Sequence, residues 1–263
     1  MNGPGKPLAP PAGQGQGIFI FGYGSLAHTP GFRYAPRVEG YIEGWRRVWW
    51  QGSTDHRGTP EAPGRTVTLT PDPAAKTHGV AFEVAGDSAE VERTVAYLEW
   101  REKQYDVRTR VDVKGRGGEV LVAGALCYVA SDSPANVNWL GPAPVESIAA
   151  QIASASGPSG PNAPYLYKLA DVMRSMGVDD PELFALEAAV RRLEAAGGGG
   201  AAGAAALAAA AAARAARVLR HGEEGGGGGG KAAGAGAAAV AMEAVARGDV
   251  PVAAAAAGEE GCS

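Results

Sequence analysis

The spacing of apolar and polar positions changes along the chain, and this change predicts strands first and helices afterwards. Residues 18–21 are four apolar residues in a row, which is typical of a strand buried on both faces. A period of two recurs at Val67 and Leu69 and again at Val80 and Phe82, as in half-buried strands. Further strands are predicted over residues 38–51 (one long or two short), 107–113 and 119–130.

Helical spacing begins after Asp87. Asp87 and Glu90 have the spacing of a capping box. Val91, Val95 and Leu98 then fall at i, i+4 and i+7, which places them in one apolar stripe. Three later helices are predicted from their start and stop signals: from Pro144 to about residue 156, from an Asn162 cap to Gly177, and from Asp180-Pro181 onward.

This order of elements predicts an α+β fold. Strands come mostly first, one helix is inserted, and three helices close the domain. We expect a largely antiparallel or mixed sheet that curls into a β-barrel with flanking helices, over residues 18–195.

The two ends of the chain differ in composition from this domain. Residues 1–17 are rich in Pro, Gly and Gln and are expected to be disordered. Residues 196–263 are largely Ala and Gly and are expected to be a disordered or fraying low-complexity tail. A marginal alanine-rich helix over 204–221 is the alternative there, and its arginines argue against a membrane span. Removing everything after Ala196 is therefore expected to change stability and turnover little.

Charge and cysteine content exclude several classes of protein. A net charge of −4 and a pI near 5.7 provide no basic surface for nucleic acid or anionic membranes. The two cysteines, Cys127 and Cys262, form no disulfide framework, and the four histidines lack metal-ligand spacing. The first 17 residues do not resemble a signal peptide. A cytoplasmic location is expected by default.

The first strand runs directly into Gly22-Tyr23-Gly24-Ser25. Glycine allows a ligand to approach the backbone closely. A dinucleotide loop also begins this way but needs a helix at once, and Thr29-Pro30-Gly31 instead predicts a turn. A tight turn without function and a small-molecule site both remain open.

Glu102 stands where the apolar stripe of the 87–102 helix calls for a further core residue. It lies at i+11 from Val91, whereas Glu92 and Lys103 point outward. A carboxylate in apolar surroundings has a raised pKa and can accept a proton near neutral pH. The alternative is a structural ion pair with an arginine such as Arg108.

Ser25, Asp55 and His56 have the composition of a hydrolase triad. Adjacent Asp and His rarely orient each other as a triad needs, and the G-x-S-x-G motif is absent. A glycine loop with free N–H groups and one apolar-face carboxylate suit a different reaction class, proton removal from an amine or carbon acid beside a carbonyl.

Several segments together resemble a known family. The chain is similar to the ChaC family, the glutathione-specific γ-glutamylcyclotransferases, over roughly residues 18–193. The resemblance is carried by Phe21-Gly22-Tyr23-Gly24-Ser25-Leu26, Gln51-Gly52-Ser53-Thr54-Asp55-His56-Arg57-Gly58, Pro63-Gly64-Arg65-Thr66-Val67-Thr68-Leu69, Tyr97-Leu98-Glu99-Trp100-Arg101-Glu102-Lys103, Leu140-Gly141-Pro142-Ala143-Pro144 and Gly157-Pro158-Ser159-Gly160.

The resemblance implies an activity and site residues. Glutathione would be cleaved to 5-oxoproline and cysteinylglycine, with no metal or organic cofactor. Glu102 would be the acid/base, which is the carboxylate that the helical spacing also selects. After it, Lys103-Gln104-Tyr105-Asp106 is one residue shorter than in many members and resembles the plant-type branch. The γ-glutamyl group would be held by Ile20, Phe21, Gly22, Tyr23, Gly24 and Ser25.

Two alternatives to this enzyme remain open. One is a broader cyclotransferase acting on other γ-glutamyl dipeptides. The other is a non-catalytic module of the same fold that only binds a small ligand. The sequence implies no nucleic-acid or membrane partner and leaves the oligomeric state open.

Overall fold

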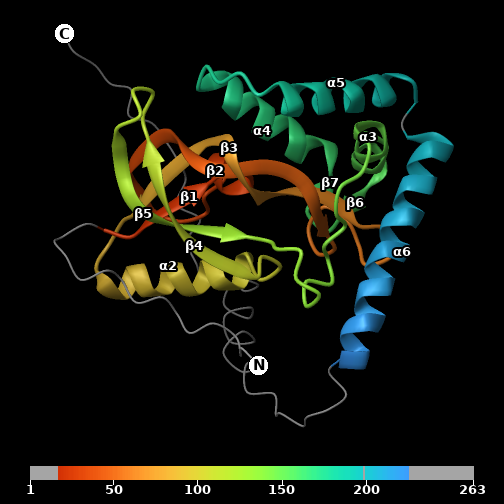
Figure 1. Cartoon of the computed structure of the whole chain (residues 1–263), viewed down its shortest axis with the longest axis horizontal. Coiled ribbons are helices and arrows are strands. Elements are labelled where there is room, and N and C mark those ends of the chain that lie inside the picture. The colour runs from red at the N-terminus through yellow and green to blue at the C-terminus, as the bar shows by residue number, and fades with distance from the viewer. Residues whose placement is uncertain (1–16, 198, 225–263) are drawn as a thin grey trace. The chain divides into compact units, whose positions relative to one another are not determined.

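Five strands close into a barrel in the computed structural model, which describes residues 17–197 and 199–224 (Figure 1). The order around the barrel is β1–β3–β2–β4–β5. All neighbours are antiparallel except β1 and β5, which are parallel. The expected mixed barrel is therefore confirmed. The strands are β1 Phe19–Gly22, β2 Tyr34–Ser53, β3 Gly64–Val84, β4 Val107–Lys114 and β5 Val120–Val129, with a small hairpin of β6 Ser156–Gly157 and β7 Gly160–Pro161.

The prediction of two separate strands around 66–70 and 80–84 is wrong. Both belong to β3, a strand of 21 residues that pairs with the 20 residues of β2. The polar stretch between them stays extended because its backbone pairs with β2, as Thr77 does with Ile42. Pro71 is accommodated next to a register shift between Glu43 and Trp45. Sheet pairing here overrides local composition.

Helices cover the barrel on different sides (Figure 1). α2 lies along one side, α4 and α5 lie on the opposite side, and α3 stands between α5 and α6. This arrangement gives the barrel two apolar clusters, one inside it toward α4 and one beneath α2. The helices are α1 Ser25–His28, α2 Ser88–Arg101, α3 Val145–Ser154, α4 Ala163–Ser175, α5 Pro181–Ala195 and α6 Gly200–Glu224.

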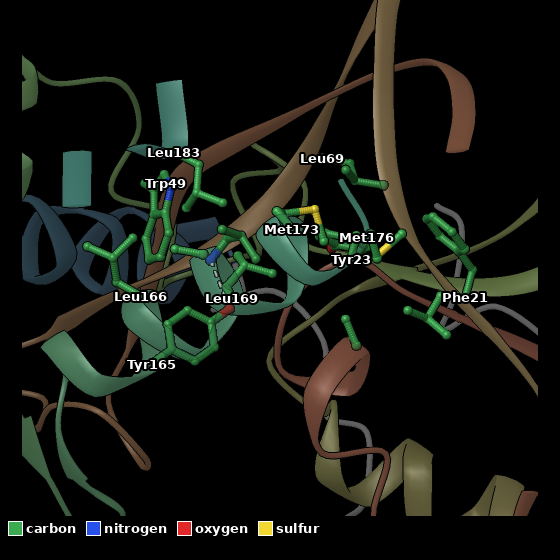
Figure 2. Packing of buried hydrophobic residues seen from close by; sticks show 14 of the residues in the cluster. Phe21, Tyr23, Trp49, Leu69, Tyr165, Leu166, Leu169, Met173, Met176 and Leu183 are labelled. Atoms are coloured by element: carbon green, nitrogen blue, oxygen red, sulfur yellow. Dashed lines mark hydrogen bonds between the residues drawn. The ribbon is translucent and has the colours of Figure 1, made fainter. Parts of the chain in front are cut away.

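The main core joins the barrel interior to α4 and α5. Leu166, Leu169 and Met173 of α4 are fully buried, as the predicted spacing of that helix requires. Figure 2 shows them packed with Trp49 and Leu69 of the long strands. This core fixes one end of β1 and hence the place where the glycine loop begins.

The helix caps agree with the sequence in two cases and differ in one. Asp87 and Glu90 form the predicted capping box of α2, and Asp180 caps α5 by accepting from Leu183 N–H. Asn162 stands at the start of α4 but makes no side-chain cap. Its buried amide instead pairs with the backbone of Arg65, through Oδ1 to N–H at 2.6 Å and Nδ2 to C=O at 2.9 Å. Asn162 therefore joins α4 to β3.

Residues 200–224 do not fray as expected; they form α6, which packs on α3. Gly203 makes this possible, because a Cβ there would collide with Ser154. Ala210 is also buried. The expectation that cutting after Ala196 changes little therefore loses its basis. Residues 1–16 and 225–263, where disorder was also expected, lie outside the described residues.

Within the described ranges, one span passes a length-and-composition test for crossing a bilayer, Gly200–His221 in α6. The contacts of α6 fit a helix packed on the surface of this domain better than a helix that crosses a bilayer. Arg214 and Arg217 point to polar groups of a neighbouring loop, and the helix rests on α3.

Candidate active site

The glycine loop leaves β1 and turns directly into one helical turn. Residues 29–31, where the sequence predicts a turn, are not helical, but a four-residue helix that was not predicted, α1 Ser25–His28, precedes them. Thr29 and Pro30 end it, so no long helix follows. Within the described part of the chain, the backbone N–H groups of Gly24 and Ser25 make no hydrogen bond. They remain available to a ligand.

Glu102 is placed at the other side of the loop by the end of α2. The helix stops at Arg101, and Glu102 is its C-terminal cap, with its N–H donating to Leu98 C=O at 2.8 Å. Leu98 is fully buried beneath the helix, as the apolar stripe predicts. The Glu102 side chain is only 10% exposed, so the carboxylate is a buried group at a helix end. Arg108 does not pair with it and binds Glu99 instead.

Arg101 ties this carboxylate to the glycine loop. Its Nε lies 3.2 Å from Glu102 Oε1. Its terminal nitrogens donate to the carbonyl oxygens of Pro30 at 2.7 Å and Thr29 at 2.9 Å. One of them also lies 3.4 Å from Ser25 Oγ. A planar guanidinium with several donors can hold two segments in one fixed geometry.

The loop and the carboxylate line one cavity. Among the predicted site residues it is lined by Phe21, Gly22, Tyr23, Gly24, Ser25 and Glu102. Ile20 does not line it and is buried against Leu98 and other residues beneath α2. The Tyr23 hydroxyl donates to Tyr128 C=O at 2.7 Å, so it braces the wall of the site. The cavity holds about 20 Å³, enough for a water molecule; a larger ligand requires the lining side chains to move apart.

Burial controls the electrostatics of Glu102. Desolvation raises the pKa of its carboxyl above the usual range, and Asp55 adds to the rise. Arg101 and Arg108 act in the opposite direction on this pKa. The net direction is upward, which makes Glu102 a better proton acceptor near neutral pH than an exposed glutamate.

The Ser25, Asp55 and His56 triad does not assemble. Asp55 pairs with Lys103 Nζ at 3.1 Å, and His56 Nδ1 lies 3.1 Å from Ser159 Oγ. Among the described residues, neither makes a hydrogen bond to Ser25, whose hydroxyl instead lies near Arg101. Among the residues that the structure describes, no three His, Cys, Asp or Glu side chains are grouped as metal ligands.

A larger cavity, of about 550 Å³, lies between α3 and α6. Its wall consists mostly of alanines, with Arg65, Gln151, Glu146 and Ser147 as polar members. It lacks both the free N–H groups of the glycine loop and a buried carboxylate, because Glu146 is exposed. Acid–base chemistry is therefore better supported at the smaller cavity.

Sequence reasoning did not assign four other lining residues, Leu26, Val67, Tyr105 and Tyr128. Tyr105 follows Glu102 by three positions, and its hydroxyl donates to Val67 C=O at 2.8 Å. Arg101 was part of the quoted motif but received no role. The position of Arg101 directly before the candidate base Glu102 was the one signal in the sequence that could have indicated its role.

The chain is similar to known proteins in sequence and in fold. A family model described as ChaC-like protein matches residues 18–193. The chain belongs to this family. The match covers the barrel and the helices through α5 but leaves out α6.

Relatives of this ChaC-like chain carry explicit names. γ-Glutamylcyclotransferase 2-3 of Arabidopsis thaliana is 44% identical over 179 residues, covering 67% of this chain and 89% of the relative. Glutathione-specific γ-glutamylcyclotransferase 1 of Danio rerio is 46% identical, covering 66% and 88%. A crystal structure of a γ-glutamyl cyclotransferase specific to glutathione from yeast is 28% identical with a TM-score of 0.60, covering 68% of this chain and 97% of that one.

Gly24 provides a test of the loop. A Cβ at this position would lie 2.7 Å from Val67 Cγ2 and 3.0 Å from the Tyr165 hydroxyl, so a side chain would push into the cavity wall. We expect Gly24→Ala to lower kcat/KM at least about tenfold while the protein still folds. Gly24→Val is a less informative variant, because its larger side chain collides further and a loss of binding would be harder to separate from misfolding. Normal kcat/KM in Gly24→Ala would show that the loop is a passive turn.

Proposed function

We propose that this ChaC-like protein is a lyase that cleaves glutathione to 5-oxoproline and cysteinylglycine. The observation that carries the proposal is the shared cavity, in which a buried carboxylate faces a glycine loop with free N–H groups. The names of the relatives support the substrate. A place in glutathione catabolism in the cytoplasm follows as part of the proposal.

The reaction is an intramolecular acyl transfer. The α-amine of the γ-glutamyl group attacks its own γ-carbonyl carbon, which forms a C–N bond and a five-membered lactam. The amide bond to the cysteine nitrogen breaks, and that nitrogen leaves as the amine of cysteinylglycine. No water and no redox partner is consumed, so the atoms balance within one substrate molecule.

Glu102 provides the proton transfer in this scheme. An α-amine with a pKa of about 8 is mostly protonated at neutral pH and then has no free electron pair for attack. Glu102 takes this proton and can return it to the leaving nitrogen. Its burial keeps the carboxylate weakly solvated and raises its pKa above the usual range for glutamate.

The glycine loop serves the second requirement, the negative charge on the carbonyl oxygen. The N–H groups of Gly24 and Ser25 are suited to donate to this oxygen as charge develops. Arg101 fixes the distance between loop and carboxylate. Holding the amine against the carbonyl lowers the barrier by several kcal/mol through proximity, on the order of 7 kcal/mol in the best cases.

The pH dependence should report Glu102. A base works in its ionised form, and a raised pKa moves the loss of activity to higher pH. We expect the apparent pKa of the acid limb in the pH profile of kcat/KM to lie above about 4.3, the ordinary pKa of glutamate. His28 does not produce this limb, because burial and the charges of Lys168, Arg101 and Arg57 lower its pKa to about 4. An acid limb at or below the ordinary glutamate value in a pH profile would contradict the assignment.

Product analysis tests the proposed function. Incubation with glutathione should release 5-oxoproline and cysteinylglycine in equal amounts. Parallel incubations with γ-glutamyl dipeptides distinguish the broader cyclotransferase, for which both substrate classes would turn over with similar kcat/KM. Binding of glutathione without either product would favour the non-catalytic module.

A further inference from the structure

Two arginines of α6 attach this helix to the loop between β5 and α3. Arg217 Nη1 donates to the carbonyl oxygens of Ser133 at 2.9 Å and Asn136 at 3.2 Å. Arg214 Nε donates to Asn138 Oδ1 at 3.0 Å. A guanidinium shared among several carbonyls restrains a loop more than a single contact would. We call residues 131–138 the clamped loop.

The clamped loop holds a buried glutamine of β2. Asn136 Nδ2 donates to Gln51 Oε1 at 3.0 Å and also to Ser131 C=O at 2.7 Å. Gln51 is fully buried. Its Nε2 donates to Gln104 C=O at 3.0 Å, so both ends of the Gln51 amide are used. A buried amide with both ends bonded has one orientation, because any other would leave a polar group unsatisfied.

Gln104 belongs to the turn that carries Glu102. The turn is closed by Tyr105 N–H donating to Glu102 C=O at 2.8 Å. The clamped loop reaches it a second time through Ser131 N–H, which donates to Asp106 Oδ1 at 2.7 Å. A continuous set of hydrogen bonds therefore runs from α6 to the turn of the candidate base.

We propose that α6 is a positioning element for the Glu102 turn, with Arg217 and Gln51 as its positioning residues. α6 lies outside the part of the chain that matches the family model. Positioning of the Glu102 turn by a helix at this place would therefore be a property of the present chain. The inference rests on the proposed function for its kinetic test and stands apart from it for its structural test. Small displacements of a base are costly, because proton transfer requires close geometry.

Arg217→Ala removes the hydrogen bonds from Arg217 to the clamped loop. The contacts between α6 and α3 remain and should keep α6 folded. We expect kcat to fall about three- to tenfold with KM little changed. Arg220→Ala is the matched control, since Arg220 is exposed on the same helix and makes no hydrogen bond among the described residues. This control should keep the wild-type kcat. Gln51→Met keeps the side-chain volume without hydrogen bonds and should lower kcat by a similar factor.

A double-mutant cycle tests whether the two residues act along one route. In the Gln51→Met background, Arg217→Ala should have little further effect on kcat, because the link to Gln104 is already broken. Amide exchange gives an independent readout. The Tyr105 amide should exchange faster in Arg217→Ala than in Arg220→Ala, without any substrate present.

The outcomes separate the inference from the proposed function. If wild-type protein releases no 5-oxoproline, the proposed function fails, and the exchange of Tyr105 still decides the inference. If Arg217→Ala lowers only the melting temperature, with kcat and Tyr105 exchange as in wild type, α6 is merely a stabilising helix. If the two substitutions, Gln51→Met and Arg217→Ala, lower kcat independently, so that their fold-changes multiply in the double variant, the proposal is also overturned.

Discussion

Glu102→Gln should lower the release of 5-oxoproline from glutathione by at least about a hundredfold. Positioned acid–base groups contribute about 10²–10⁴-fold to rate. Glutamine keeps the size of the side chain and can still accept from Arg101, whose Nε lies 3.2 Å away in the wild type. It cannot take a proton from the substrate amine. The measurement is the initial rate of 5-oxoproline and cysteinylglycine release by variant and wild type.

The stability of the same variant should hold or improve at neutral pH. The raised pKa of Glu102 means that its ionised form is disfavoured by folding. A neutral amide removes this cost. The gain should shrink as pH falls through the raised pKa of Glu102, since below this pKa the wild-type carboxyl is neutral too. Thermal unfolding across pH measures it.

Glu92→Gln is the matched control, because Glu92 is an exposed carboxylate on the same helix. It should keep wild-type turnover. A Glu102→Gln protein that cannot fold would support the structural ion-pair interpretation of Glu102. A folded variant with wild-type turnover would refute the mechanism.

Arg65→Met should cost about 3 kcal/mol of unfolding free energy, since it leaves three buried acceptors without a donor. Arg65 is 5% exposed and donates to Gln151 Oε1 at 2.7 Å, Trp49 C=O at 2.7 Å and Gly141 C=O at 2.8 Å. It joins β2, α3 and the segment before α3. No carboxylate lies within ion-pair distance of it among the described residues.

Losing the unpaired Arg65 charge offsets part of this cost, which is why the expected value is not larger. Arg65→Lys keeps the charge without the planar fork and should fall between methionine and wild type. Arg37→Met is the control, because Arg37 forms only an exposed pair with Glu39 and should change stability by less than about 1 kcal/mol. Denaturant unfolding compares the three. Equal stability of Arg65→Met and the control would show that Arg65 is not a structural link.

The barrel was predictable because its strands carry their own pattern. The apolar run of β1 and the alternation in β4 are local signals, and the capping box of α2 is another. The continuity of β3 was not predictable, because Pro71 and its polar neighbours are held extended only by pairing with β2. α6 was predicted only as a marginal alternative, over residues 204–221, for a similar reason. An alanine-rich helix is marginal alone, and its stability here depends on α3 and on the loop bound by Arg217.

Only the part of the candidate site that depends on local spacing could be predicted from the sequence. Helical spacing placed Glu102 on the buried face, because the spacing is a property of one helix. The roles of Arg101 and Tyr105 depend on groups far along the chain, Thr29 and Val67. No periodicity within one element reveals which distant backbone group a side chain will meet.

Cleavage of glutathione in water enriched in ¹⁸O tests the central claim most directly. If the α-amine of the substrate attacks the γ-carbonyl, no water oxygen enters the product. Mass spectrometry should then find 5-oxoproline without ¹⁸O, together with an equal amount of cysteinylglycine. Release of glutamate carrying ¹⁸O would show hydrolysis by water and would contradict the cyclisation mechanism.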